Sequence, residues 1–528
     1  MPGPVRCALH RPGPGLGCGP GRGCHGLGSG VARDRAGGGR DRAADPGPAR
    51  GGLVRGAAFG AARSCPAGDR RRSLALKPQR PRDLGRPCPP AFSSFFSPTW
   101  HSMCISSPAS SCRVETRTRR SWDRRGTPMG YELSTDDMEA LLLGGAFFGS
   151  GGGGTVQSAR HLCAHFKPGR YYPTDRVEVV GVAEATEGEA VMVAYMGAPE
   201  AINSVAYPIG PVEAARAVQQ RLVSQGRTLA YIAPPESGAL GFVVAVLVAA
   251  KLGLKVIDGD GAGRAVPSLP MLTYAAAGVS PRPTFLVSQG ELRVELDVTP
   301  RYGEDGGLQH QQDVSVIVEQ MTRPIVAAPQ FGQFGGLALW VMPPTLLDKA
   351  LPIRGTVARA LTLGRALQAG QITATDAMIE FLAERFHIQA VPIMPPGRLM
   401  AVQTDTSGGF DTGKVVLQSN GQTVTVLFEN ESLLAWDSAK PHPIAMAPDS
   451  IAYFLEGKGQ AVYTNGDLIQ SNGTLDPSVM NRRASLLAWR AEAPLTEPGG
   501  LILDSFRDAL KDLGYLGPYV PVDALAAA

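Results

Sequence analysis

Three stretches of the sequence join a run of strand-forming residues to a polar segment rich in turn residues. They are "MGAPE" (196–200), "PPESG" (234–238) and "DGDGAGRAVP" (258–267). The carboxyl ends of parallel strands meet at one edge of a sheet, where open α/β proteins bind their ligands. We therefore predict that the following side chains form one catalytic site: Glu236, Asp258, Asp260 and Arg264.

Asp258 and Asp260 are separated by a single glycine. Two carboxylates at this spacing can bind a divalent metal ion or act as a general base, so we expect a divalent metal ion as cofactor, with these two aspartates as ligands. The alternative is an Asp-rich turn whose carboxylates pair locally with Arg264. If the carboxylates do not meet, the next candidates are Asn430, Glu431 and His310.

The segment "GGAFFGSGGGG" (144–154) contains the spacing G-x-G-x-x-G at 149–154. A dinucleotide-binding loop has a strand before its glycines, whereas a helical pattern precedes these, and no Walker-type Gly-Lys-Ser/Thr follows. No nucleotide is therefore expected. Two interpretations stay open: close helix packing that excludes side chains, or a turn whose amides bind an anionic or oxyanionic group near a helix N-terminus. In the second, the substrate-binding residues are Gly151, Gly152, Gly153 and Gly154.

Three further groups of residues carry weaker signals. "LFENE" places Asn430 and Glu431 at the end of a predicted strand, and we include both among the substrate-binding residues. Asp449 lies in a predicted turn. His161 and His165 share a helix face, but no Glu adjoins His161 as in the metalloprotease motif, so a polar helix face is the preferred interpretation over a zinc site.

The order of elements predicts an α/β fold. Strands expected at 176–182, 190–197, 228–233 and 254–258 alternate with helices at 211–226 and 237–252, which favours a parallel sheet. Helices follow in 344–386. From about residue 395 the pattern becomes mostly β, with Asn-Gly turn signals at Asn420, Asn465 and Asn472. We therefore predict a parallel-sheet α/β domain over 129–303, then a helical segment and a mostly β domain over 304–528.

Residues 1–128 differ sharply from the rest. They carry 23 basic and 7 acidic side chains and seven of the eight cysteines, and lack any periodic apolar pattern. Such a segment cannot bury enough apolar surface to offset the entropy lost on ordering. We expect it to be disordered and to reflect a start site assigned too far upstream of Met129. A nucleic-acid-binding arm and a transit peptide are the alternatives.

Residues 129–528 carry 28 basic and 40 acidic side chains, a balance that argues against a nucleic-acid partner. Their single cysteine, Cys163, excludes a disulfide framework. They contain no unbroken apolar run of about 18 residues, so no membrane association is expected and the predicted location is the cytoplasm. The longest apolar stretch, "GALGFVVAVLVAAKLG", is predicted to be a buried core helix.

The motifs of residues 129–522, taken in order, resemble the S-methyl thiohydantoin desulfurase family, whose genes often accompany those of hydantoinases and oxoprolinases. The matching motifs are "GGAFFGSGGGG", "MGAP", "DGDGAGRAVP", "SGGFDTGKVVL", "FENE", "PDSI" and "GYLGPYVPV". The sequence departs from the family pattern in "ESGALG", where Glu236 matches but a Gly pair and an Asn do not, and at Ser268, where the family tends to have an acid.

The resemblance implies two domains and a hydrolase that removes a sulfur substituent from a small five-membered cyclic ureide, with or without a metal ion. The hydrolysis needs a base or metal ion to activate water, and donors for the developing negative charge. We expect Glu236, Asp258 and Asp260 in the first role, and Arg264 with the glycine amides in the second. The alternative is a non-catalytic binding or scaffold subunit of a hydantoinase-type partner protein. The sequence is also compatible with a homo-oligomer.

Overall fold

The computed structural model describes residues 130–197, 205–299, 308–407, 410–470 and 472–527; of 308–313 and 407 it describes the backbone alone. The predictions for residues 1–128 and for the end of "MGAPE" therefore lie outside the described residues. So does the side chain of His310, although its backbone belongs to helix α6.

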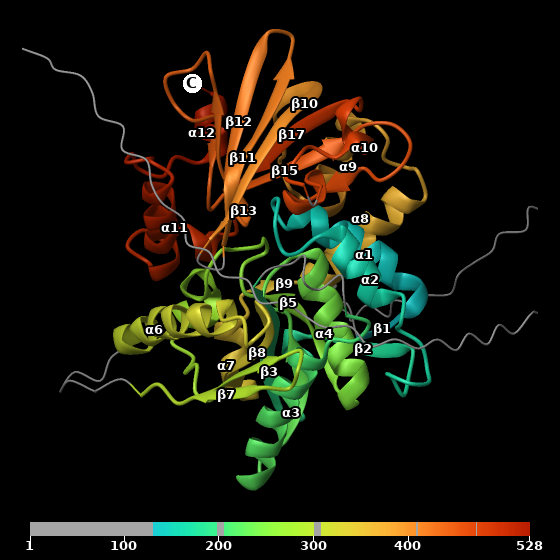
Figure 1. Cartoon of the computed structure of the whole chain (residues 1–528), viewed down its shortest axis with the longest axis vertical. Helices are drawn as coiled ribbons and strands as arrows, with labels where there is room; N and C mark the ends of the chain where they lie inside the picture. The colour runs from blue at the N-terminus through green and yellow to red at the C-terminus, as the bar shows by residue number, and fades with distance from the viewer. Residues whose placement is uncertain (1–129, 198–204, 300–307, 408–409, 471, 528) are drawn as a thin grey trace, which may run out of the picture. The chain divides into compact units, whose positions relative to one another are not determined.

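The first sheet has nine strands in the order β1-β2-β5-β4-β3-β8-β6-β7, with β9 paired to β5 (Figure 1). Its four central strands, β2, β5, β4 and β3, are parallel to one another. Antiparallel strands continue it on both sides. The bounds are β1 Tyr131–Ser134, β2 Arg176–Gly181, β3 Glu189–Gly197, β4 Leu229–Ala233, β5 Lys255–Asp260, β6 Thr284–Ser288, β7 Arg293–Leu296, β8 Phe334–Met342 and β9 Ile353–Arg354.

The predicted α/β class is thus confirmed, with the parallel pairing confined to the centre of a mixed sheet. β8 and β9 lie beyond residue 303 in the chain, yet both pair within the first sheet. The helices of this part are α1 Met138–Phe148, α2 Val156–Cys163, α3 Ile209–Ser224, α4 Ala239–Leu252, α5 Thr273–Ala276, α6 Leu308–Ala327 and α7 Pro344–Ala350. The chain therefore returns to the first sheet after the sequence boundary expected between the domains.

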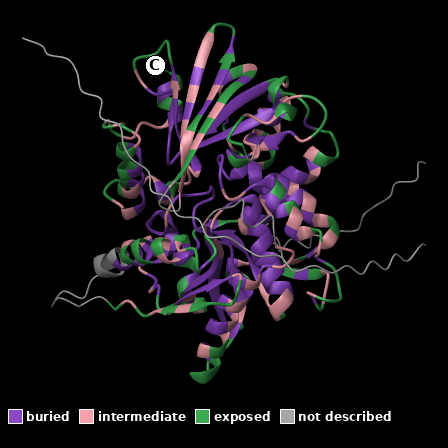
Figure 2. Ribbon diagram, in the orientation of Figure 1, coloured by how far each residue is buried: buried purple, intermediate pink, exposed green. Residues whose placement is uncertain are grey.

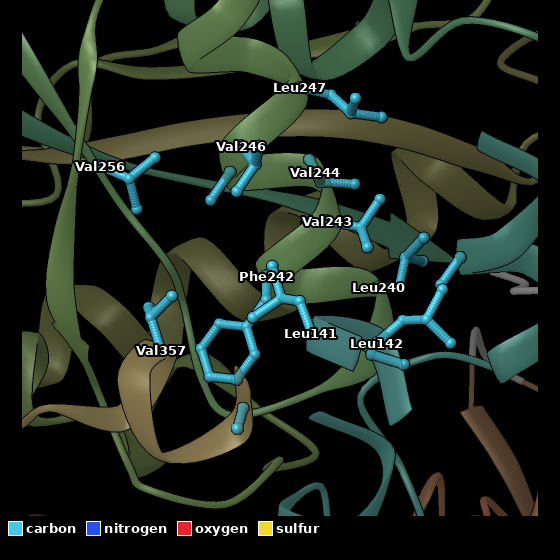
Figure 3. Packing of buried hydrophobic residues seen from close by; sticks show 14 of the residues in the cluster. Leu141, Leu142, Leu240, Phe242, Val243, Val244, Val246, Leu247, Val256 and Val357 are labelled. Atoms are coloured by element: carbon cyan, nitrogen blue, oxygen red, sulfur yellow. The ribbon is translucent and has the colours of Figure 1, made fainter. Parts of the chain in front are cut away.

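The predicted core helix is α4. All of its residues are buried except Gly241, Lys251 and Leu252. Its Leu and Val side chains pack with Leu141 and Leu142 of α1 in one apolar cluster (Figure 3). Gly253 ends the helix in the left-handed conformation, with φ +68°, which glycine adopts without strain. An evenly apolar helix of this kind is stable only with protein on all sides, as observed here.

Two glycines permit a close crossing of α1 and α8. A Cβ atom at Gly144 of α1 would overlap with the carbonyl oxygen of Ala360 in α8, and one at Gly364 of α8 would overlap with that of Ala140 in α1. The first glycines of the glycine-rich segment therefore serve helix packing. Phe147 of α1 in turn stacks on Trp489 of β17, at 5.1 Å between ring centroids.

The second sheet has eight strands in the order β14-β13-β12-β11-β10-β17-β15-β16, all antiparallel. Its strands are β10 Val391–Ser407, β11 Phe410–Ser419, β12 Gln422–Glu429, β13 Glu431–Asp437, β14 Ala445–Met446, β15 Ser450–Leu455, β16 Val462–Tyr463 and β17 Ala484–Trp489. In β12 every second residue is buried, the pattern of a strand with one face toward a core (Figure 2).

The predicted mostly β second domain is therefore confirmed. The helices that follow β9 in the chain are α8 Thr356–Gln368, α9 Thr375–Phe386, α10 Pro477–Met480, α11 Leu501–Asp512 and α12 Val522–Ala526. Asn420 and Gly421 have φ values of +49° and +82° in the two-residue turn between β11 and β12, as predicted from the Asn-Gly pair. Asn465 instead precedes a short 3₁₀ helix with φ −55°. None of the helices among the described residues is both long and apolar enough to cross a membrane.

Candidate active site

A cavity of about 580 Å³ lies where the carboxyl ends of β3 and β4 face loops of the second domain. Its polar lining comes from the glycine-rich segment, the β4–α4 turn, α6 and the β12–β13 turn, together with the residues around Asn465. Apolar side chains form the rest of the wall: Met192, Met196, Leu240, Leu272, Leu337, Phe428 and Ile469. This size is typical of pockets that enclose a small organic ligand.

The glycine loop, residues 149–154, follows a path that residues with side chains rarely adopt. Gly151, Gly153 and Gly154 have φ values of +85°, +71° and +82°. Ser150 also lies in the left-handed region, at +51°. A Cβ atom at Gly153 would lie 2.6 Å from the Cα atom of Gly238, and one at Gly152 would overlap with Oε1 of Glu431. The loop therefore requires glycine both for its conformation and for the close approach of its neighbours.

The glycine loop joins the two domains through its main chain. The amides of Ser432 and Asn465 donate to the carbonyl oxygens of Ser150 and Gly151, at 2.9 and 2.7 Å. The amide of Gly152 donates to Gly149 within the loop, and that of Gly153 to Oε1 of Glu431 at 3.3 Å. Since these two amides already have acceptors, they are not the open donors that an oxyanion nest would need.

A protein carboxylate also occupies the helix N-terminus after the loop. Asp467 accepts hydrogen bonds from the first amides of α2, at 3.0 Å from Val156 and 3.4 Å from Gln157. Thr155 caps the same helix by accepting from the amide of Ser158. Asp467 therefore occupies the helix N-terminus at which the second interpretation of the glycine-rich segment placed an anionic group.

Glu236 and Glu431 line the same cavity from different domains. Glu236 follows β4, and its Oε2 atom accepts a hydrogen bond from the amide of Val266 at 2.7 Å. Glu431 begins β13 and is 3% exposed. Its Oε2 atom is buried without a hydrogen-bond partner among the described residues. The fold thus brings together two carboxyl groups that are 195 residues apart in the sequence.

Burial and mutual repulsion change the protonation of this carboxyl pair. Burial raises the pKa of Glu431 to about 8, while the nearby positive charge of Arg264 opposes that rise. Burial is also the main cause that raises the pKa of Glu236 well above its usual range, and the negative charge of Glu431 adds to it. The pair therefore retains at least one proton near neutral pH.

Arg264 lies behind the cavity wall and is 1% exposed. Its guanidinium group donates to the main-chain carbonyl oxygens of Ala265, Ser432, Pro448 and Asp449, at 2.7 to 3.0 Å. It does not line the cavity, so it cannot donate directly to a ligand there. It fixes the main chain next to Glu431 and supplies a buried positive charge near the carboxyl pair.

Asp258 and Asp260 also lie outside the cavity lining. Oδ1 of Asp258 accepts the amides of Val357 and Ala358 at the start of α8, at 2.9 and 3.2 Å, and Oδ2 accepts the hydroxyl of Tyr131. Asp260 accepts the amides of Ala262 and Gly263 within its own turn and the hydroxyl of Ser237. The two aspartates thus serve separate local structures, so the expectation that they meet Glu236 at a common water or ion is corrected.

The same hydrogen bonds decide whether these aspartates fit a metal ion. N–H and O–H groups point at their carboxylate oxygens, where an ion would have to lie, so Asp258 and Asp260 do not fit a divalent cation. Across the described ranges, no three His, Cys, Asp or Glu side chains are grouped so that they could hold one. His161 of α2 and His165, which lies two residues beyond the end of that helix, are 6.1 Å apart between ring centroids and away from the cavity lining. They therefore do not share a helix face as predicted.

Asn430 lies in the turn between β12 and β13, with φ +54°. Its side-chain oxygen accepts the amide of Asp411, and its carbonyl oxygen accepts the side-chain amide of Asn465. Asn465 is 2% exposed and also accepts the hydroxyl of Tyr453. These contacts explain why Glu431 enters the cavity at a fixed position: polar groups hold both the turn before it and the loop beside it.

Sequence reasoning missed three charged residues of the cavity wall: Glu319, Arg323 and Asp411. Arg323 pairs with Glu319 at 2.5 Å, one helical turn earlier in α6, and lies over the ring of Phe410 at 4.1 Å. Asp411 accepts the hydroxyl of Thr406, and its carboxylate has no ion-pair partner within the part of the chain described. The i, i+4 spacing of Glu319 and Arg323 was the available signal, but it is equally typical of a solvated helix face.

The fold and the cavity define a two-domain α/β and β protein whose cavity is lined by two glutamates, half-buried Glu236 from the first domain and buried Glu431 from the second. Two family models match the chain, for the S-Me-THD-like N-terminal domain at residues 136–297 and the S-Me-THD-like C-terminal domain at residues 312–502. The chain belongs to this family, which confirms the resemblance to the S-methyl thiohydantoin desulfurases.

A protein from Chromobacterium violaceum with a known crystal structure shares 59% sequence identity with the chain. The match covers 74% of this chain and 100% of that one, with a TM-score of 0.68. No curated protein matches the chain.

Proposed function

We propose that the protein is a hydrolase that removes the sulfur substituent from an S-methyl thiohydantoin or a closely related five-membered cyclic ureide. In this reaction the ring carbon that carries the sulfur loses methanethiol and gains the oxygen of water, which leaves a hydantoin. The family membership supports the ring chemistry. The observation that carries the proposal is the carboxyl pair formed by half-buried Glu236 and buried Glu431 in a cavity of suitable size.

The carboxyl pair suits a reaction that needs an acid and a base at once. We assign the role of base to Glu431, whose Oε2 atom receives no hydrogen bond from the described residues, so its carboxylate accepts a proton from the attacking water. We assign the role of acid to Glu236, whose pKa is raised well above its usual range by burial, so it protonates the ring nitrogen and makes the adjacent carbon more electrophilic. Attack forms the C–O bond, and collapse of the tetrahedral adduct breaks the C–S bond. The proton held by Glu431 then passes to the departing sulfur, which leaves as methanethiol. The hydroxyl proton of the adduct returns to Glu236 as the carbonyl forms.

A thiol assay tests the proposal. The full chain is incubated with an S-methyl thiohydantoin, and methanethiol is measured with a chromogenic thiol reagent. We expect turnover by the wild type, and a loss of kcat of about 10²–10⁴-fold in Glu236→Gln and in Glu431→Gln. Asp411→Asn, which removes another cavity carboxylate, is the matched control and should retain most of the activity.

The pH profile adds a second test. Since Glu431 must be ionised, kcat/KM should rise with pH up to about 8 and fall again where Glu236 loses its proton. Failure of the wild type to release methanethiol from alkyl-substituted and unsubstituted rings, or full activity of both glutamine variants, would refute the proposal.

A further inference from the structure

The cavity presents carboxyl oxygens and offers a ligand little positive charge. Of its five charged lining residues, four are acidic: Glu236, Glu319, Asp411 and Glu431. The fifth, Arg323, is already engaged by Glu319 and by the main-chain oxygen of Pro267, at 2.5 and 2.8 Å. An anionic ligand would therefore meet mostly like charges, whereas a cation would meet acceptors.

A buried oxygen atom of Glu431, a residue that lines the cavity, is an unused acceptor among the described residues. Oε2 of Glu431 makes no hydrogen bond in the described part of the chain, and the residue is 3% exposed. A buried carboxylate oxygen without a donor is unfavourable, because it has lost its water without gaining a replacement. Oε1 of Glu236 likewise receives no hydrogen bond from the described residues, since the amide of Val266 reaches Oε2. The pair thus leaves two acceptor positions for N–H donors of a ligand.

The charges around the pair decide the charge of that ligand. Arg264 is the buried cation that acts on both glutamates, Arg323 acts on Glu431, and Asp260 and Glu429 add negative charge from outside the lining. With one proton on the pair, the net charge of the two glutamates and Arg264 is zero. If a monovalent cation binds and this proton leaves, the net charge of these groups and the ligand is still zero, so no net charge is buried.

We propose that the Glu236–Glu431 pair is a binding site for a cyclic amidinium cation, whose N–H groups donate to Oε2 of Glu431 and Oε1 of Glu236. The inference rests on the proposed function, because a thiohydantoin ring protonated by Glu236 is itself a cyclic amidinium. A permanently charged cyclic guanidine resembles this activated ring, while a hydantoin or a cyclic urea resembles the product. The site therefore binds the cyclic guanidine more tightly and is inhibited by it.

The test compares two ligands of nearly equal size by calorimetry on the full chain: 2-aminoimidazoline, a cyclic guanidinium cation, and 2-imidazolidinone, the neutral cyclic urea. We expect the cation to bind at least about tenfold more tightly. Titrations in two buffers with different heats of ionisation should show that a proton is released on binding. A neutral ligand bound as tightly as the cation would overturn the inference.

Three variants locate the site. Glu431→Gln should weaken binding of 2-aminoimidazoline by at least about tenfold and leave 2-imidazolidinone nearly unaffected. Glu236→Gln provides the same test should the first variant fold poorly. Asp411→Asn removes an equal charge from the wall outside the pair and should change the affinity less than about threefold. Equal losses in all three variants would show a general charge effect and refute a specific site.

The thiol assay separates this inference from the proposed function. Methanethiol release without preferential binding of the cation would refute the amidinium site and leave the hydrolase proposal standing. Preferential binding through Glu431 without methanethiol release would refute the proposed reaction and leave the binding site.

Discussion

Replacement of Glu431 by Gln should make the protein more stable at alkaline pH. Burial raises the pKa of Glu431 from 4.5 to about 8. The folded state therefore holds this proton more tightly than the unfolded state, and stability falls as the pH rises between these two values. A rise of about 3.5 pH units corresponds to roughly 5 kcal/mol when the group is fully ionised. Of this, about 3 kcal/mol is lost between about pH 6 and pH 9.

Gln has the same shape as Glu and no charge, so the unfolding free energy of Glu431→Gln should not fall in this way as the pH rises. It also removes the repulsion that helps to raise the pKa of Glu236. Urea unfolding at about pH 6 and about pH 9 measures the difference, with the fluorescence of buried Trp340 and Trp489 reporting on the two sheets. We expect the unfolding free energy of the wild type to fall by about 3 kcal/mol more than that of the variant.

Asp411→Asn is the control for this experiment, since Asp411 is half-buried and should leave the pH dependence as in the wild type. Two results would show that the reasoning is wrong: the same loss of stability in Glu431→Gln as in the wild type, or a wild type whose stability does not change over this range. Either would mean that water or a cation reaches Glu431 and stabilises its charge, so that burial does not control its protonation.

Three substitutions separate structural from catalytic roles. In Gly152→Ala the added methyl group would overlap with Oε1 of Glu431. The rate of methanethiol release should therefore fall more than about tenfold, while the melting temperature drops little. A fully active variant would show that Glu431 can move freely. Asp258→Ala leaves two amides of α8 without an acceptor, so it should lower the unfolding free energy by about 1–3 kcal/mol and leave kcat nearly unchanged. A large loss of kcat at normal stability would show that Asp258 is a catalytic residue. Asp467→Ala should lower the unfolding free energy by about 0.5–2 kcal/mol through the N-terminus of α2, and unchanged urea unfolding would contradict that capping role.

The local sequence contains much of the information about the elements. The apolar run of α4 predicted a buried helix because only a helix with protein on every side accommodates so many Val and Leu residues. Asn420 and Gly421 predicted their hairpin because both residues of that turn need positive φ values. The same dipeptide at Asn465 was misleading, because its side chain binds the main chain of Asn430 and the hydroxyl of Tyr453 instead of forming a hairpin.

The sequence also predicted that the glycine loop is not a nucleotide site, because the pattern before it is helical, and helix α1 does precede the loop. It could not show what the loop does. Gly152 faces Glu431 and Gly153 faces Gly238, and both contacts join segments that are far apart in the chain. Whether a glycine is needed for its own φ or for the approach of a distant neighbour depends on tertiary packing.

The sequence by itself determined the class of the fold, the family and the residue types available for acid–base chemistry at the carboxyl end of the sheet. The tertiary structure alone decided which carboxyl groups lie in the cavity. Asp258 and Asp260 have chemistry as suitable as that of Glu236, but nearby amides satisfy their oxygens. Glu431 comes from the other domain, and one of its oxygens has no hydrogen-bond partner in the part of the chain that the structure describes. A carboxylate oxygen is available to a ligand only where the folded chain supplies no hydrogen-bond donor to it. Which donors reach each carboxylate depends on how segments that are distant in the sequence pack together.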